Sequence, residues 1–171
     1  MAVLIEAINL VIRADALERR YPGGIEALLE NPPNPSICAD RHLCRIGFID
    51  AEELERFVDR LERCGLAVLV ENRFVDAAVV DQVQGLAGDC DWLDFAGAAG
   101  RPVYCWLRGA DPGAVMVPED WEYETSLSRR FGRTTNDFSA ATHRFLRTVD
   151  GVDIYEDSST GEEVFFGRAD R

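Results

Sequence analysis

The densest cluster of metal-ligating side chains lies between Cys38 and Cys44, where the chain reads C-x-D-x-H-x-C. Thiolate, imidazole and carboxylate groups are the ligands that zinc and similar metals take from proteins. Side chains alternate along a strand, so all four groups would share one face if the segment were extended throughout. The spacing matches no zinc motif, and both thiols can instead pack as small apolar groups beside a turn that contains His42. A metal-dependent enzyme that uses His42 stays open as an alternative, and no metal site is assigned.

Nucleophilic catalysis has little support. A reactive thiol needs a lowered pKa and a neighbouring base, and the histidines are His42 and His143 alone. Cys64 falls at the C-terminal end of an expected helix, where the helix dipole disfavours a thiolate. The serines occur without a G-x-S-x-G elbow, and the many carboxylates between residues 76 and 94 match no calcium-loop spacing. No catalytic residue is therefore assigned, and the sequence favours a protein that is not an enzyme.

All 18 basic residues are arginines, against 31 acidic residues, which gives a formal net charge of −13. Without lysine the chain cannot supply a Schiff base, anchor pyridoxal phosphate or complete a P-loop, and no cofactor is assigned. The strong negative charge also argues against binding to duplex nucleic acid, because affinity for that polyanion comes mainly from neutralised phosphates.

Aromatic residues gather on two expected strands, residues 90–95 and 103–108. Alternation places Trp92 and Asp94 on one face of the first strand, and it places Tyr104, Trp106 and Arg108 on one face of the second. Tryptophan, tyrosine and arginine are enriched at binding hot spots, because they combine large contact area with hydrogen-bond donors. We expect these residues to bind a partner, unless a helix covers the face and makes it a second core.

A small-molecule protein is the main alternative. Its pocket would lie between the sheet and the helical region at residues 16–30, which is broken by Tyr21-Pro22-Gly23-Gly24. Arg45, Trp92 and Arg108 are the candidate anchors, because such pockets combine apolar walls with a few convergent polar groups.

One segment is basic. Residues 126–149 hold five arginines and one aspartate, and residues 150–171 hold seven acids and two arginines. Arg129, Arg130 and Arg133 form a candidate anion-binding group. The alternative is internal pairing with the acids that follow, which are already close along the same chain.

Hydrophobic periodicity and turn residues predict the elements that carry these groups. Expected helices span residues 16–20, 25–30, 51–64 and about 137–147. Expected strands span residues 3–12, 37–39, 42–49, 66–70, 74–80, 90–95, 103–108, 114–117, 152–155 and 162–166. The best supported is the helix at 51–64, where Asp50 precedes Glu53 by three residues in a capping-box pattern and Gly65 follows as a terminator.

Strands that outnumber helices and mostly join through short turns predict an α+β fold with a largely antiparallel sheet. The β-α-β-β order of residues 42–80 has the layout of a ferredoxin-like core, and residues 152–166 are expected to form a closing β-hairpin. The length favours one domain over residues 1–171. With 47% hydrophobic residues, no apolar span and five cysteines without an export signal, we expect a cytoplasmic, non-membrane protein. The favoured function is a non-catalytic protein-interaction module.

Overall fold

The computed structural model describes residues 1–98, 101–122, 126–130, 143–149, 152–157 and 163–167. Its helices are α1 (Ala14–Arg20), α2 (Gly24–Glu30), α3 (Ala51–Arg63) and the single turn α4 (Leu127–Arg130). Its strands are β1 (Ala2–Leu4), β2 (Ile8–Arg13), β3 (Cys38–Ala39), β4 (Leu43–Phe48), β5 (Leu69–Val70), β6 (Arg73–Phe74), β7 (Ala77–Asp81), β8 (Gly85–Leu86), β9 (Leu93–Ala98), β10 (Arg101–Leu107), β11 (Val115–Met116), β12 (His143–Val149), β13 (Val152–Asp157) and β14 (Glu163–Gly167). The predicted α+β class with antiparallel sheets is confirmed. In the described part of the chain, no helix is long and apolar enough to cross a membrane.

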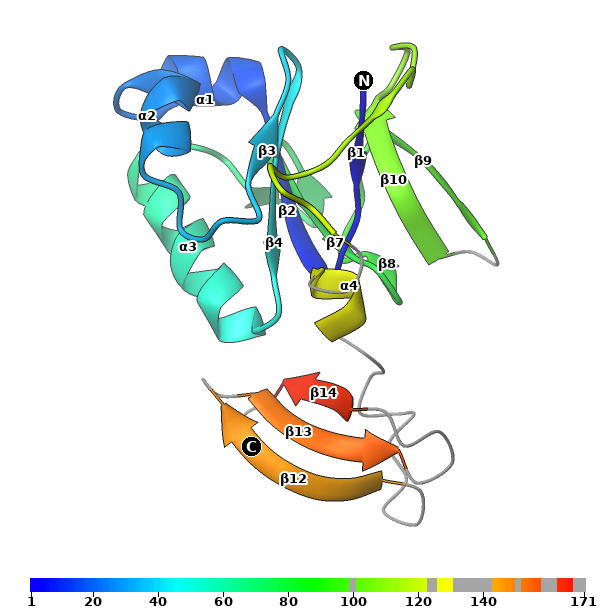
Figure 1. Ribbon diagram of the computed structural model, residues 1–171. Helices are drawn as coiled ribbons and strands as arrows, with labels where there is room; N and C mark the ends of the chain where they lie inside the picture. Colours follow the sequence, from blue (N-terminus) through cyan, green and yellow to red (C-terminus); the bar gives the residue numbers. More distant parts are fainter. Residues whose placement is uncertain (99–100, 123–125, 131–142, 150–151, 158–162, 168–171) are drawn as a thin grey trace.

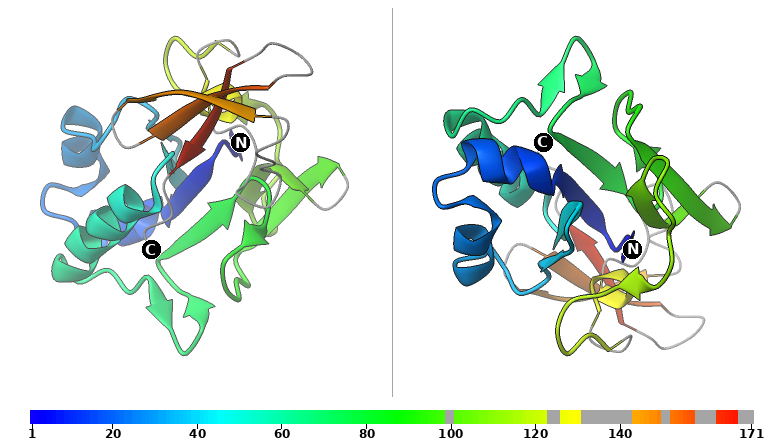
Figure 2. Two further views of the ribbon diagram at one scale, coloured as in Figure 1. Left: turned by 90° about the horizontal axis from the view of Figure 1, so that it is seen from below. Right: turned by 90° about the horizontal axis from the view of Figure 1, so that it is seen from above.

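The central element is a five-stranded sheet in the order β3-β4-β2-β7-β8, in which every neighbouring pair is antiparallel. Since β4 and β7 both pair antiparallel with β2, they run parallel to each other. The chain between them includes α3 and passes from the β4 side of β2 to the β7 side. All six residues of β4 are buried. Figure 1 shows α1, α2 and α3 on one side of this sheet and β1, β9 and β10 on the other, and Figure 2 shows the same three layers from below and above.

The N-terminal run is divided between two sheets. Val3 and Leu4 in β1 pair with Cys105 and Tyr104 in β10, within a four-stranded sheet of order β11-β1-β10-β9. The strand predicted at 3–12 is therefore wrong as one continuous element. The break lies at Ala7, whose φ of 54° is left-handed and ends regular extension.

Ala7 leads to the first testable prediction. Glycine adopts a positive φ without the steric cost that an L side chain incurs. We expect Ala7→Gly to raise the free energy of unfolding by about 0.5–1 kcal/mol, despite the greater freedom of the unfolded chain. Ala7→Val should lower it, because a branched side chain is both strained and overpacked at this buried position. Urea denaturation of the three proteins measures the difference, and equal stability of Ala7→Gly and Ala7→Val would contradict the prediction.

The helix predicted at 51–64 is confirmed as α3. The carboxylate of Asp50 accepts a hydrogen bond from the Glu52 backbone N–H at 2.8 Å, which satisfies one free donor of the first turn. Leu54, Phe57 and Leu61 are buried on one face, as their spacing predicts. Gly65, with φ 92°, follows the end of the helix.

The helix predicted at about 137–147 is wrong for residues 143–147, which belong to β12, while residues 137–142 lie outside the described residues. β12 pairs with β13, and β13 pairs with β14, in a separate antiparallel sheet seen at the bottom of Figure 1. Non-local pairing overrides the weak helical periodicity of Phe138, Ala141 and Phe145 in this segment.

Candidate functional site

The outer face of the four-stranded sheet carries the aromatic residues of the predicted site. Tyr104 and Trp106 are partly buried neighbours on β10, with ring centroids 6.1 Å apart and ring planes tilted by 35°. The strand register places Trp106 opposite Asp94 and places Tyr104 between Ala96 and Leu4. We call Asp94, Tyr104, Trp106 and Arg108 together the aromatic face. An aromatic pair in this arrangement offers a large contact area with few rotatable bonds.

Arg108 is held at one end of the aromatic face. Its Nε donates to Asp94 Oδ1 at 2.9 Å and its Nη2 donates to the Leu93 carbonyl at 3.2 Å. Just over half of the Arg108 side chain is nevertheless exposed. The guanidinium is therefore oriented by its neighbours and still presents a flat, charged surface beside Trp106.

The opposite face of the same sheet is part of the core. Val3, Leu93 and Cys105 are buried there with residues of the five-stranded sheet. Val103, which strict alternation would place on the same face as Cys105, is instead 43% exposed, and the register with β9 shifts between Pro102 and Tyr104. At the β11 edge of this sheet, Val115 lies opposite the buried Ala2 of β1 and is 42% exposed.

The structure separates Trp92 from the aromatic face. Trp92 precedes β9 and is only 8% exposed, and its indole Nε1 donates to the Phe74 carbonyl at 3.0 Å. Its polar edge is thus satisfied inside the protein, and its ring belongs to the core. The alternation argument placed Trp92 beside Asp94, but the regular strand begins only at Leu93, so the argument does not extend to it.

Arg45 lies in the interior of the five-stranded sheet, with a relative exposure of 0%. Its Nε donates to Asn9 Oδ1 at 2.6 Å, its Nη1 to the Ser36 carbonyl at 3.0 Å and its Nη2 to Glu6 Oε2 at 3.2 Å. Burial acts to lower the pKa of this guanidinium, and the carboxylate of Glu6 beside it acts in the opposite direction. Arg45 is bonded on all three nitrogens within the chain.

Asn9 is the hub of this polar network. Its Oδ1 also accepts from the Glu6 backbone N–H at 3.2 Å, and its Nδ2 donates to the carbonyls of Ala7 and Val80. The amide therefore uses all of its hydrogen-bonding capacity across the break between β1 and β2. The sequence signal for this network is the occurrence of Glu6 and Asn9 within the apolar run 3–12 and of Arg45 within a second apolar run, because buried polar groups need partners.

A pocket lies against α1, but it is bounded by α1, α2 and the turn at Asp40 and Arg41, and not by the strands of the sheet. It has a volume of about 420 Å³. The predicted anchors Arg45, Trp92 and Arg108 do not line it. Its walls are instead formed by Ala14, Asp15, Glu18, Arg19, Ile25, Asp40 and Arg41. Arg19 pairs with Asp15 at 2.6 Å, so these two charges neutralise each other.

The cysteines near His42 do not converge. Cys38 lies opposite Arg45 and Cys44 lies opposite Ala39 in the β3–β4 register, which places the two thiols on opposite faces of the sheet. Asp40 accepts hydrogen bonds from the His42 and Leu43 backbone N–H groups at 2.8 Å and so forms the turn. Among the described residues there is no group of three or more histidine, cysteine or acidic side chains that could hold a metal ion. The alternation needed for a shared ligand face is broken by the turn.

Burial also shapes the chemistry of the thiols. It raises the pKa of Cys38 to about 11, and it raises the pKa of Cys44 and Cys105 further still. A thiol with a raised pKa remains protonated at neutral pH, and only the thiolate is a strong nucleophile. These three thiols are therefore packed core groups.

The second testable prediction is a loss of stability at alkaline pH. An unfolded thiol releases its proton near pH 9, while folded Cys38 retains its proton until its pKa of about 11, so raising the pH between these values favours unfolding. Each pH unit is worth at most about 1.4 kcal/mol for one such thiol. Cys38→Ala should show a shallower loss than the parent protein in urea denaturation at pH 8, 9.5 and 10.5. Identical slopes would contradict this assignment.

The candidate anion-binding arginines lie at the edge of what is described. Arg129 and Arg130 end α4, and Arg133 lies outside the described residues. Two other arginines of the basic segment are engaged on β12, where Arg144 pairs with Glu156 and Arg147 pairs with Glu163. Internal pairing thus accounts for this part of the segment.

Comparison of the chain with known protein families finds no family that matches it, and comparisons with curated proteins and with solved structures also find no match.

Proposed function

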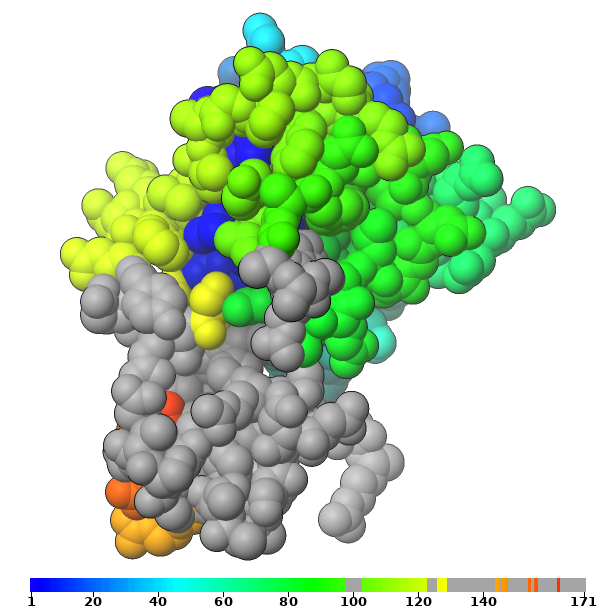
Figure 3. Space-filling view, turned by 90° about the vertical axis from the view of Figure 1, so that its right-hand side faces the viewer, coloured from blue at the N-terminus to red at the C-terminus, as the bar shows by residue number. Residues whose placement is uncertain are grey.

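We propose that the protein is a non-catalytic interaction module that binds a basic protein partner through the aromatic face. The observation that carries this proposal is the Tyr104–Trp106 pair beside the oriented guanidinium of Arg108. In Figure 1, α1, α2 and α3 lie on the far side of the five-stranded sheet from β9 and β10. Figure 3 views the right-hand side of Figure 1, away from these three helices, where residues of β9 and β10, in green, lie at the surface.

The charge of the chain supports a basic partner. A net charge of −13 attracts a cationic protein over a distance of about one Debye length and raises the rate of encounter. The aromatic residues would then provide the short-range contact area, as buried aromatic anchors do in interface hot spots. Charge and aromatic surface therefore have separate roles, one in the rate of association and the other in the lifetime of the complex.

The chemistry of the thiols supports the non-catalytic part of the proposal. Cys38 and Cys44 lie on opposite faces of the sheet, and the pKa of each is raised by burial. All five cysteines are free, which supports a reducing compartment, and we propose the cytoplasm.

The finer fold features belong to the same proposal. The β4–α3–β7 unit, with β2 between its two parallel strands, supports a ferredoxin-like core. The antiparallel pairing of β13 with β14 supports a closing β-hairpin at the C-terminal end of a single domain.

Site-specific photo-crosslinking tests the function. A benzophenone amino acid at position 106 should give, in living cells, a crosslink to one recurrent polypeptide of basic isoelectric point, identified by mass spectrometry. The matched control places the same amino acid at Arg63, an exposed position on α3 on the other side of the molecule. The same set of products from both positions, or none from position 106, would overturn the proposal.

A further inference from the structure

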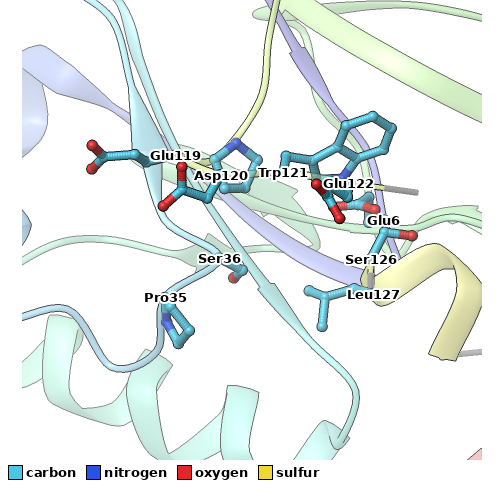
Figure 4. A pocket seen from close by; sticks show the side chains of 10 residues that line it. Glu6, Pro35, Ser36, Glu119, Asp120, Trp121, Glu122, Ser126 and Leu127 are labelled. Carbon is cyan, nitrogen blue, oxygen red and sulfur yellow. The ribbon is translucent and has the colours of Figure 1, made fainter. Parts of the chain in front are cut away.

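A second pocket, between the segment that follows β11 and the break between β1 and β2, has a volume of about 180 Å³. Figure 4 shows Glu6 and Trp121 at one end of it and Glu119 at the other. The Glu6 carboxylate is 1% exposed and paired with Arg45, and the Trp121 indole N–H is buried, so a ligand in this pocket reaches neither group. Hydrogen-bonding groups that a partner can reach lie instead along β9.

β9 is the outermost strand of the four-stranded sheet, on the right of Figure 1. One side of its backbone therefore has no neighbouring strand in the described part of the chain. β9 is six residues long, whereas the other edges of the two sheets that share the core, β11, β3 and β8, are strands of two residues. A long free edge is the kind of surface to which another extended chain adds by backbone pairing.

Two backbone hydrogen bonds fix which residues of β10 face β9. The Ile5 N–H donates to the Val103 carbonyl at 2.8 Å, so Val103 faces β1, and Cys105, two residues further on, faces β1 as well. The Arg108 N–H donates to the Trp92 carbonyl at 2.8 Å, so Arg108 faces the β9 side. The two bonds agree, and both direct the N–H and C=O groups of Cys105 toward β1 and away from β9.

The outward groups of β9 follow from this alternation. Phe95 lies opposite Cys105, so the N–H and C=O groups of Phe95 point away from β10. Gly97 lies opposite Pro102, which has no N–H to donate, and its N–H and C=O groups point the same way. Within the described ranges, β9 pairs with β10 alone, and no other backbone group bonds to Phe95 or Gly97. These two residues thus leave two donors and two acceptors for a partner at the edge.

β9 lacks the side chains that usually protect an edge strand from pairing, which are lysines, prolines and unpaired charges. The strand reads LDFAGA, and its one charged residue, Asp94, is paired with Arg108 at 2.9 Å. Gly97 is exposed, and together with the small Ala96 it leaves room for a second backbone to approach.

The side chains of β9 determine what an added strand would carry on each face, because residues opposite each other in a sheet share a face. A residue opposite Phe95 would lie beside a ring that packs against the core, where an apolar side chain fits. A residue opposite Asp94 or Ala96 would lie on the aromatic face, with the Tyr104 ring beyond Ala96 on the next strand. A basic side chain there would meet a carboxylate and an aromatic ring, and both attract cations.

We infer that β9 binds an extended segment of a basic protein partner as a fifth strand of this sheet, with apolar and basic residues alternating along the segment. The inference rests on the proposed function and names the part of the partner that is bound. The outward groups of Phe95 and Gly97 repeat every about 7 Å, which matches another extended backbone and not a helix. A second copy of this chain is disfavoured, because each copy carries a net charge of −13 and the two repel.

Hydrogen exchange in ¹⁵N-labelled protein tests the inference, with the peptide Ac-Arg-Val-Arg-Val-Arg-NH₂ as the probe. The Phe95 and Gly97 amides should exchange rapidly in the free protein and slow by about tenfold or more at saturating peptide, since each gains a hydrogen bond. The Asp94 and Ala96 amides, which face β10, should be protected throughout and serve as internal controls. Protection of Phe95 and Gly97 in the free protein would overturn the inference, and protection that rises with protein concentration would identify a second copy as the occupant.

Two N-methylated peptides of identical composition separate backbone pairing from charge. In the proposed register the valine N–H groups face β9, and the arginine N–H groups face solvent. Methylation of the two valine nitrogens should weaken binding roughly tenfold or more, while methylation of two arginine nitrogens should change it less than about twofold. Equal weakening by the two peptides would show that charge alone holds the probe, and it would contradict strand addition.

A pair of variants extends the test to the natural partner. Gly97→Pro removes one outward N–H at an edge position where proline is tolerated, and Gly97→Ala keeps that N–H. With the benzophenone amino acid at position 106, Gly97→Pro should lower the crosslink yield several-fold, and Gly97→Ala should leave it near the parent level. An undiminished crosslink from Gly97→Pro would overturn strand addition and leave the proposed function standing. The absence of a crosslink from the parent protein would overturn the proposed function and the inference with it.

Discussion

Replacing Arg45 by methionine should lower the free energy of unfolding by about 3–5 kcal/mol, the cost of removing one partner of a buried ion pair. Arg45 and Glu6 are almost completely buried, and the side chain of Arg45 also bonds to Asn9 and the Ser36 carbonyl. Methionine has a similar apolar length, so the change leaves packing largely intact. The substitution removes the guanidinium that pairs with the buried carboxylate of Glu6. It also leaves Asn9 Oδ1 and the Ser36 carbonyl without this hydrogen-bond donor.

Two comparisons isolate this effect in urea denaturation at pH 7. Adding Glu6→Gln to Arg45→Met should recover part of the lost stability, because the uncompensated charge is then absent. Arg108→Met is the matched exposed control, since its ion pair with Asp94 lies in solvent and is worth about 0–1 kcal/mol. If Arg45→Met costs no more than Arg108→Met, the polar network is not what stabilises the interior.

The contrast between these two arginines shows what a sequence can and cannot predict. Both were named as candidate anchors of a small-molecule pocket, in which a few polar groups converge between apolar walls. Alternation within one strand grouped Tyr104 with Trp106, and the ion pair with Asp94, which lies opposite Trp106, holds Arg108 at the end of the same strand. The same reasoning could not place Arg45, because its partners Glu6 and Asn9 lie nearly forty residues earlier and meet it only through the pairing of β2 with β4.

Local signals account for the elements that were predicted well. The Asp50 cap and the apolar spacing of α3 depend on residues within one segment, and so does the turn formed by Asp40. The errors depend on distant pairing. The left-handed Ala7 is stabilised by its contacts with Gln82, and β12 exists as a strand because β13 pairs with it. Neither partner can be identified from the local sequence.

The aromatic face provides the prediction with the largest expected effect on binding. Trp106→Ala should weaken binding of the crosslinked partner by about 2 kcal/mol or more, close to thirtyfold in Kd. Trp106 lies in the middle of the aromatic face, between Tyr104 and the ordered Arg108, where truncation removes contact area and lets water reach the neighbouring groups. Its partial exposure means that stability should change much less than affinity.

Calorimetric titration of the purified partner measures this effect, with two matched variants. Tyr104→Phe keeps the ring beside Trp106 and should change affinity less than fivefold, since it loses at most one hydrogen bond worth about 1 kcal/mol. Leu69→Ala removes an apolar side chain that is more exposed than Trp106 from β5, outside the aromatic face, and should leave affinity unchanged. If Leu69→Ala weakens binding as much as Trp106→Ala, the partner recognises general apolar exposure. We expect affinity to fall only for Trp106→Ala, while the denaturation curves of the free proteins stay nearly unchanged. That result would assign the binding energy to the aromatic face, because only Trp106→Ala among the three variants removes its contact area.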